Sequence, residues 1–115
     1  DINISNAVKV QFVHHVQSDL LSPGKKVTLF RILQEQTKNI LKYSKASDVT
    51  IYLDCKTDQA QLIIQDNGIG FDAKHTKTGV GLSSIYDRTN FYNGTVNIDT
   101  APGKGCTLTV KIPIL

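Results

Sequence analysis

Hydrophobic residues recur at two spacings along this chain, and the change from one spacing to the other predicts where its elements lie. Between residues 29 and 45 they return every three or four positions, which is typical of an amphipathic helix. At about 100° per residue, one side of that helix carries Leu29, Phe30, Leu33, Thr37, Ile40, Leu41 and Ser44. The opposite side is a polar stripe of Arg31, Glu35, Lys38, Asn39 and Lys42. Ser22 and Pro23 are typical of an N-cap and a first helical position, so the helix is expected to run from there to about Lys45.

Alternation of apolar and polar residues predicts strands on both sides of this helix. Strands are expected at residues 8–16, 49–55, 60–65, 95–99 and 106–112. The run 60–65 is the richest in apolar residues and is therefore expected to be central in the sheet. A second helix is expected over 79–92, ended by Gly94 in the left-handed conformation that suits glycine.

The order strand, helix, hairpin, loop, helix, hairpin predicts an α/β two-layer sandwich. A mixed sheet of about five strands would be covered on one face by the helices. A chain of 115 residues suits one compact domain, which we take to span 1–115. Because the sequence begins without Met, we expect this domain to be excised from a longer protein.

Composition narrows the function classes. The net charge is +3 and the basic residues are scattered, so no nucleic-acid patch is indicated. No apolar run approaches the roughly 20 residues that cross a bilayer, and no signal peptide opens the chain. Cys55 and Cys106 match no metal-ligand spacing, which favours free thiols in a reducing compartment. We therefore expect a cytoplasmic domain without direct nucleic-acid or membrane contacts.

The first candidate constellation is Glu35, Asn39 and Lys42 on the polar stripe of the long helix. Mg²⁺ prefers oxygen ligands, and the amide oxygen of Asn39 can hold it when phosphate oxygens and waters complete the octahedron. Lys42, one turn later, can offer positive charge to those phosphates. Glu35, one turn earlier, can orient a metal-bound water. On its own, such a stripe is more often a solvated helix face.

Two glycine-bearing segments supply what this stripe lacks. Asp66-Asn67-Gly68-Ile69-Gly70 follows the central strand, where paired glycines allow close backbone approach to a flat ligand. An ionised Asp66 only accepts hydrogen bonds, so it suits an exocyclic amino group such as that of adenine. Gly79-Val80-Gly81-Leu82 opens the second helix, where backbone N–H groups favour phosphate.

In combination and in this order, the motifs resemble one family. RILQEQTKNILKYSKA resembles the N box of the Bergerat-fold ATP-binding superfamily of gyrase, chaperone, mismatch-repair and histidine-kinase proteins. DNGIGFD resembles its G1 box, TGVGLSSIYDR its G2 box, and APGKGCTLTVKIPI its closing hairpin. The form of the N box is most similar to the catalytic domain of two-component sensor histidine kinases, in the subgroup of nitrate-sensor and desaturase-regulating kinases. The resemblance covers residues 8–115.

This resemblance implies ATP and Mg²⁺ as cofactors and a role for each candidate residue. Asn39 would ligate Mg²⁺, Lys42 would contact phosphate, and Glu35 would assist the metal-bound water or the transferred phosphoryl group. Asp66 would bind the adenine amino group in a pocket shaped by Gly68 and Gly70. Residues 71–78 would form an ATP lid hinged at Gly79 and Gly81, with Leu82 beside the nucleotide.

Three positions depart from the family pattern. Tyr43 stands where many relatives have His, and Ser44 where a small Ala is common. Cys106 replaces the usual Thr of the closing hairpin, whose hydroxyl would support the adenine-binding Asp. A thiol is a weaker donor, so adenine affinity would fall unless Thr107 compensates.

The implied function is transfer of the γ-phosphoryl group of Mg·ATP to a histidine. That histidine would belong to the protein's own dimerisation domain, outside this sequence, and a response regulator would be an indirect partner. A membrane anchor elsewhere in the full-length protein stays open. The alternatives are a stand-alone anti-sigma-factor serine kinase of the same fold and a non-catalytic docking module.

Overall fold

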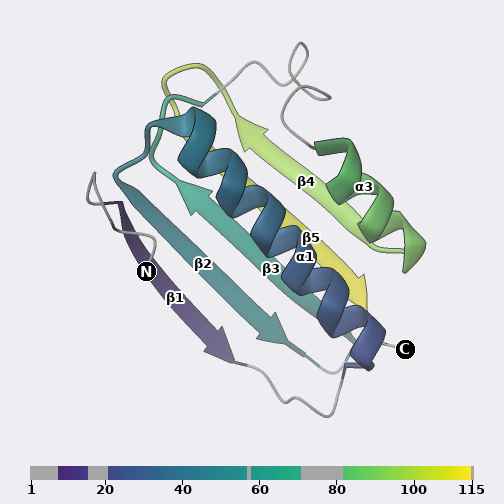
Figure 1. The fold of residues 1–115 in the computed structure, drawn as a ribbon. Coiled ribbons are helices and arrows are strands. Elements are labelled where there is room, and N and C mark those ends of the chain that lie inside the picture. The colour runs from purple at the N-terminus through teal and green to yellow at the C-terminus, as the bar shows by residue number, and fades with distance from the viewer. Residues whose placement is uncertain (1–7, 16–20, 57, 71–81, 115) are drawn as a thin grey trace.

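A computed structural model describes residues 8–15, 21–56, 58–70 and 82–114. The elements in chain order are β1 (Lys9–His15), α1 (Pro23–Asn39), η2 (Ile40–Ser44), β2 (Asp48–Cys55), β3 (Gln59–Asp66), α3 (Leu82–Phe91), β4 (Thr95–Thr100) and β5 (Cys106–Pro113). Figure 1 shows α1 lying across one face of the sheet, with α3 beside it on the same face. The predicted two-layer α/β sandwich is confirmed.

The sheet has five strands in the order β1-β2-β3-β5-β4. β1 pairs with β2 in parallel and every other pair is antiparallel, so the sheet is mixed as predicted. β3 is the middle strand, in agreement with its apolar sequence. Its last residue, Asp66, pairs with Val49 of β2 on one side and with Cys106 of β5 on the other. The sheet therefore fixes this carboxylate at the carboxyl end of its central strand.

The face that α1 turns to the sheet differs from the predicted apolar side. The buried residues of α1 are Leu29, Ile32 and Gln36, followed by Ile40 at its end. Phe30 and Leu41, which lie on the predicted apolar side, are 57% and 52% exposed. The apolar stripe of this helix is wider than the strip that the sheet covers, so its flank remains at the surface.

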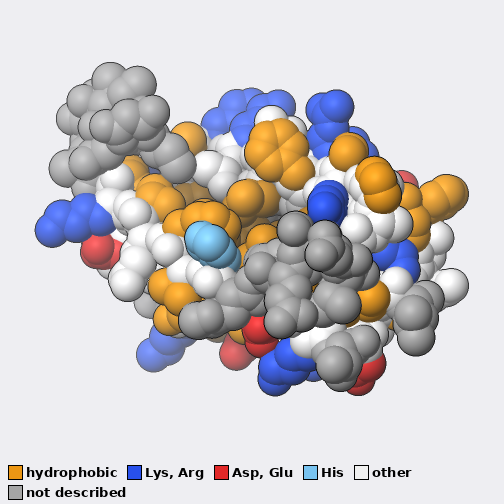
Figure 2. Space-filling view, turned by 90° about the horizontal axis from the view of Figure 1, so that it is seen from below, with side chains coloured by type: hydrophobic (Ala, Val, Ile, Leu, Met, Phe, Trp, Pro, Cys, Tyr) orange, Lys and Arg blue, Asp and Glu red, His pale blue; other side chains and the backbone are white. Residues whose placement is uncertain are grey.

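That flank borders an apolar groove between α1 and the edge strand β1. The groove has a volume of about 410 Å³ and is lined by Phe12, Leu21, Lys26, Leu29, Phe30, Leu33, Leu53 and Leu62. Figure 2 shows hydrophobic side chains gathered in a hollow on the face seen from below. Phe12 and Phe30 are each more than half exposed there.

Both helices begin or end as local chemistry requires. The Ser22 hydroxyl accepts a hydrogen bond from the Lys25 amide at 3.4 Å, which confirms the predicted N-cap. At the end of α3 the prediction was wrong in one respect, because Asn93, with φ of 60°, takes the left-handed conformation rather than Gly94. A side chain at position 94 would meet the backbone oxygen of Lys111, so glycine is needed there for packing against β5.

Candidate active site

A cavity of about 250 Å³ lies where the end of α1, the end of β3, the start of α3 and the start of β5 meet. It is lined by Gln36, Asn39, Ile40, Tyr43, Ser44, Asp66, Ile69, Gly70, Leu82 and Cys106. The structure thus brings together four residues predicted from separate motifs: Asn39, Asp66, Gly70 and Leu82. Their convergence from a helix, a strand end and a second helix makes this cavity the candidate site.

The long helix reaches the cavity through a wide turn that the sequence did not predict. After Asn39 the α-helix continues as the π-helix η2, and Lys45, with φ of 55°, ends it in the left-handed conformation. The Ser44 hydroxyl donates to the Ile40 carbonyl oxygen at 2.8 Å, and the Ser44 carbonyl oxygen accepts from the Ile69 amide at 2.8 Å. π turns occur often at functional sites, and this one joins the helix to the loop after Asp66.

Asp66 is almost fully buried, with 5% of its surface exposed. Its Oδ1 atom accepts a hydrogen bond from the Gly68 amide at 2.8 Å. Burial raises the pKa of this carboxyl above its ordinary value, and the hydrogen bond from Gly68 opposes that rise. A buried acceptor beside a cavity is suited to a ligand that presents a hydrogen-bond donor.

Gly68 and Gly70 are required by contacts between backbone segments. A Cβ atom on Gly68 would come against the Ser44 carbonyl oxygen and lie 2.9 Å from Oδ1 of Asp66. Gly70 has φ of +65°, and a side chain there would meet the carbonyl oxygen of Ala101. The glycines therefore let the loop after β3 pack between the wide turn and the β4–β5 turn, which holds Asp66 in place.

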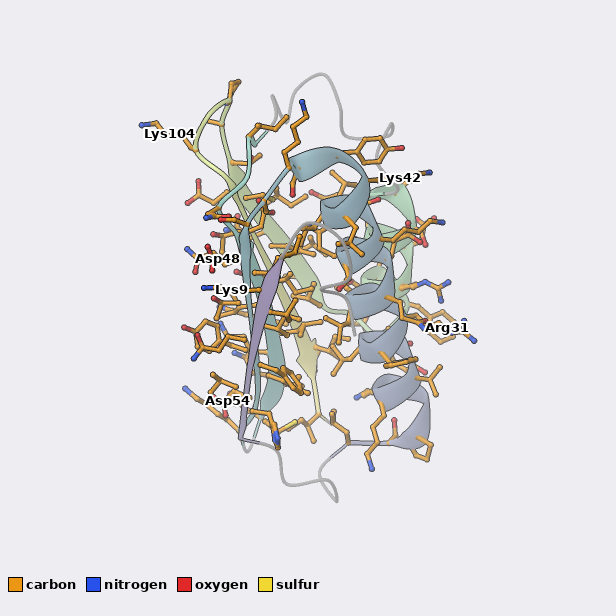
Figure 3. The ribbon with its side chains drawn as sticks, turned by 60° about the vertical axis from the view of Figure 1, so that its left-hand side comes forward. Lys9, Arg31, Lys42, Asp48, Asp54 and Lys104 are labelled. Atoms are coloured by element: carbon orange, nitrogen blue, oxygen red, sulfur yellow. The ribbon has the colours of Figure 1, made fainter. Side chains whose placement is uncertain are left out.

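The other predicted residues lie outside the cavity lining. Lys42 is exposed, with its ammonium nitrogen 5.8 Å from the centroid of the Tyr43 ring. Figure 3 shows Lys42 and Lys104 at the same end of the molecule, one in the helical layer and one in the sheet layer. Glu35 is half-buried on α1, one turn before Asn39. The predicted lid and hinge at 71–81 lie outside the described residues.

The structure contradicts the expected nucleotide contact of Thr107. This residue pairs with Gln65 of β3 and Asp99 of β4, whereas its neighbour Cys106 lines the cavity. Successive side chains of a strand point to opposite faces of the sheet. Thr107 therefore faces away from the cavity and cannot compensate for Cys106.

Two cavity residues have buried polar atoms without a hydrogen-bond partner. Among the described residues, these atoms are Oε1 of Gln36 and Nδ2 of Asn39. Buried polar atoms without a partner cost free energy and are commonly satisfied by a ligand or water. The Asn39 carboxamide also has the oxygen that a Mg²⁺–phosphate complex requires, so the residues present fit that group. Gln36 was not predicted as a site residue. The predicted apolar side of α1 did not include it, although Gln36 lies on the side that faces the sheet.

Cys106 is the departure that bears on adenine affinity. Both cysteines are free, as predicted, and the structure also buries both of them. Burial, and then the charge of Asp66, raise the pKa of the Cys106 thiol to about 11, while a hydrogen bond with Thr100 opposes the rise. The side chain is therefore a neutral thiol at pH 7, on the residue that pairs with Asp66 across the strands, and a thiol would be a weak donor to that carboxylate.

We expect Cys106→Ser to bind ATP a few times more tightly than the wild type. A hydroxyl is a better donor to Asp66 than a thiol, and a neutral hydrogen bond contributes roughly 0.5–1.5 kcal/mol. Calorimetric titration of both proteins measures the change, and Cys55→Ser is the matched control because Cys55 lies outside the cavity lining. Equal affinity of all three proteins would show that Cys106 does not support Asp66.

A protein-family model matches most of the chain. The model of the histidine kinase-, DNA gyrase B- and HSP90-like ATPases matches residues 24–115. The chain belongs to this family. The match includes every motif from which the site was predicted, and only β1 with its neighbouring residues precedes it.

Two relatives of the chain are named as sensor kinases. The chain is 38% identical over 100 residues to the sensor histidine kinase LiaS of Bacillus subtilis, covering 86% of this chain and 28% of LiaS. It is 33% identical over 114 residues to the sensor protein VraS of Staphylococcus aureus, covering 98% of this chain and 33% of VraS. The chain therefore spans about a third of the length of these relatives.

Solved structures of histidine kinases share the fold. The blue-light-activated histidine kinase of Erythrobacter litoralis superposes with a TM-score of 0.79 at 15% identity, covering 98% of this chain and 38% of that one. The ATP-binding domain of PrrB from Mycobacterium tuberculosis superposes with a TM-score of 0.71 at 20% identity, covering 93% and 80%. These likenesses confirm the α/β sandwich predicted for this ATPase-family chain.

Across the described part of the chain, the helices are too short or too polar to cross a membrane.

Proposed function

We propose that this domain binds Mg·ATP in the cavity and donates the γ-phosphoryl group to a histidine of a separate dimerisation domain, in two-component signalling. The observation that carries the proposal is that a buried carboxylate, Asp66, and the Asn39 carboxamide line the same cavity. Asp66 supplies the acceptor that adenine needs, and Asn39 supplies the oxygen that a phosphate-bound metal needs. Family membership and the named sensor-kinase relatives support the same reaction.

The residues of the chain act by binding and orientation. Asp66 accepts from the adenine 6-amino group, while Gly68 and Gly70 keep its loop packed against the wide turn. Asn39 directs its amide oxygen toward the phosphates, with Lys42 adding positive charge and Glu35 orienting water from the preceding turn. Mg²⁺ held by Asn39 would supply charge neutralisation to the transferred phosphoryl group, whose chemistry requires mainly positioning and charge stabilisation. Gly79 and Gly81, which precede Leu82 in the sequence, would contribute backbone N–H groups to phosphate, as the family motif implies.

The transfer needs a second domain. The bond between the γ-phosphorus and its bridging oxygen breaks as a bond to an imidazole nitrogen forms, and ADP leaves. The acceptor histidine would belong to the protein's own dimerisation and phosphoacceptor domain, and a response regulator would receive the phosphoryl group from it. We place this domain in the cytoplasm, where ATP and the response regulator are found.

The test is to supply the two halves of the reaction separately. This chain alone should bind Mg·ATP as a monomer but turn it over slowly, because the acceptor is missing. Adding the dimerisation domain of the same parent protein should give acid-labile phosphohistidine on that domain. Fast turnover without a partner would favour an ATPase, and stable phosphoserine on a partner would favour a serine kinase. Absence of nucleotide binding would favour a docking module.

A further inference from the structure

We infer that Gln36 is a positioning residue for the Mg²⁺ ligand Asn39, holding the Asn39 carboxamide with its oxygen toward the phosphates. The inference rests on the proposed function and adds a residue that neither the motifs nor the family comparison assigns.

Two complementary atoms carry the argument. Gln36 is 4% exposed, and its Oε1 atom, an acceptor, has no hydrogen-bond partner. Nδ2 of Asn39, a donor, likewise has none, and no other buried side-chain nitrogen or oxygen in the described ranges shares this condition. Both residues line the same cavity. One unpaired acceptor and one unpaired donor in the same small space can satisfy each other.

Helix geometry puts the two side chains within reach. Residues three apart on an α-helix are neighbours, with Cβ atoms about 5–6 Å from each other. Both positions precede the wide turn, so the regular α spacing applies to them. In the contact that we propose, which forms when Mg·ATP binds, the two side chains rotate so that Nδ2 of Asn39 reaches Oε1 of Gln36.

The metal role of Asn39 makes this contact consequential. A carboxamide carries a donor and an acceptor of nearly the same shape, and only the oxygen can bind Mg²⁺. A hydrogen bond from Nδ2 to Gln36 fixes the amide in the orientation that presents Oδ1 to the ligand. Partners of this kind orient metal-binding side chains in general. Gln36 therefore acts through Asn39.

A purely structural role for Gln36 gives a different result. A buried carboxamide that only filled space, or that held an ordered water, would affect nucleotide binding equally with and without Mg²⁺. The positioning role affects only the part of the affinity that Mg²⁺ adds. This part is the ratio of the ATP dissociation constant in excess EDTA to that in Mg²⁺.

The experiment titrates ATP calorimetrically into the wild type, Gln36→Met, Gln36→Glu and Gln34→Met, each in Mg²⁺ and in EDTA. Met has nearly the length of Gln and lacks the acceptor, whereas Glu keeps it. Gln34 is exposed on the same helix and gives the matched control. Gln36→Met should lower the ratio about three- to tenfold, the equivalent of one hydrogen bond, while the constant in EDTA stays within twofold.

The other variants complete the test. Gln36→Glu should keep the wild-type ratio or exceed it, and Gln34→Met should match the wild type. The melting temperature of ligand-free Gln36→Met should rise, because the substitution removes an unpaired buried acceptor. These results together support the positioning role.

Three outcomes would overturn it. If Gln36→Met loses affinity equally in Mg²⁺ and EDTA, its role is packing. If Gln36→Met keeps the ratio while Asn39→Ala lowers it, the metal site stands and only the role of Gln36 is wrong. If the wild type shows no Mg²⁺ dependence, the proposed metal role of Asn39 fails and the inference falls with it.

Discussion

Asp66→Asn is expected to weaken ATP binding and to remove most of a preference of roughly tenfold to a hundredfold for ATP over GTP. An ionised carboxylate accepts a hydrogen bond from the adenine 6-amino group, whereas guanine presents a carbonyl oxygen at that position. Two facing acceptors in a buried site leave a carboxylate unpaired, at a cost of about 1–3 kcal/mol. That cost corresponds to the expected preference of the wild type for ATP over GTP.

Asparagine has the shape of aspartate but can turn its NH₂ group toward the ligand. The variant should therefore accept guanine about as well as adenine. Titration of both proteins with ATP and with GTP measures the change. Asp99→Asn is the matched control, because Asp99 is an exposed carboxylate on β4. Unchanged ATP affinity in Asp66→Asn would reduce Asp66 to a turn residue and end the adenine-pocket assignment.

The raised pKa of Asp66 gives this prediction a pH dependence. Burial raises the pKa, so the folded chain holds a proton on this carboxyl more tightly than the unfolded chain does. The stability contribution of this group is therefore present below its unfolded pKa and is lost as pH rises through its folded pKa. At neutral pH the ligand-free Asp66→Asn protein should be more stable than the wild type, as denaturant unfolding will measure. Below the raised pKa, ATP affinity of the wild type should fall toward that of the variant.

Asn39→Ala is expected to lower ATP affinity in Mg²⁺ by on the order of tenfold to a hundredfold and to change it little in excess chelator. Loss of even an indirect partner of a metal ligand commonly has an effect of this size. The substitution removes the amide oxygen and leaves Asp66 and its loop in place. It also removes the unpaired Nδ2 atom, so the ligand-free protein should not be destabilised.

Parallel titrations with ATP in Mg²⁺ and in EDTA measure the effect of Asn39→Ala. Lys38→Ala is the matched control, because Lys38 is exposed on the preceding position of the same helix. An equal loss in both conditions would mean that Asn39 acts on the nucleotide without a metal ion.

Most of the fold could be predicted from residue spacing alone. Each described strand and helix lies within a few residues of its expected place, because alternation and helical periodicity report directly on burial at a sheet face or helix face. The error on α1 has a physical cause. Periodicity finds the apolar side of a helix, but only packing determines which part of a broad apolar side is covered, and here Ile32 and Gln36 were covered rather than Phe30.

The site was predictable where chemistry and spacing agree. Asn39, Asp66, Gly70 and Leu82 each carried a local signal, and the sheet brings them to one cavity. The π turn could not be predicted, since nothing in the hydrophobic pattern distinguishes it from a further α turn. The predicted nucleotide contact of Thr107 was wrong for a simpler reason. Thr107 and Cys106 are adjacent in a strand, so their side chains point to opposite faces of the sheet.

The wide turn at Ile40–Ser44 also determines where this helix can change in length. A π turn, with its bonds between residues five apart, holds about one residue more than an α turn. Deleting one residue there converts it to α geometry and leaves the flanking segments facing nearly the same way. A deletion within Pro23–Asn39 instead rotates the preceding part of the helix by about 100°, which takes Leu29 and Ile32 off the sheet. The fold should therefore tolerate the deletion of a single residue at the turn better than one in the body of the helix.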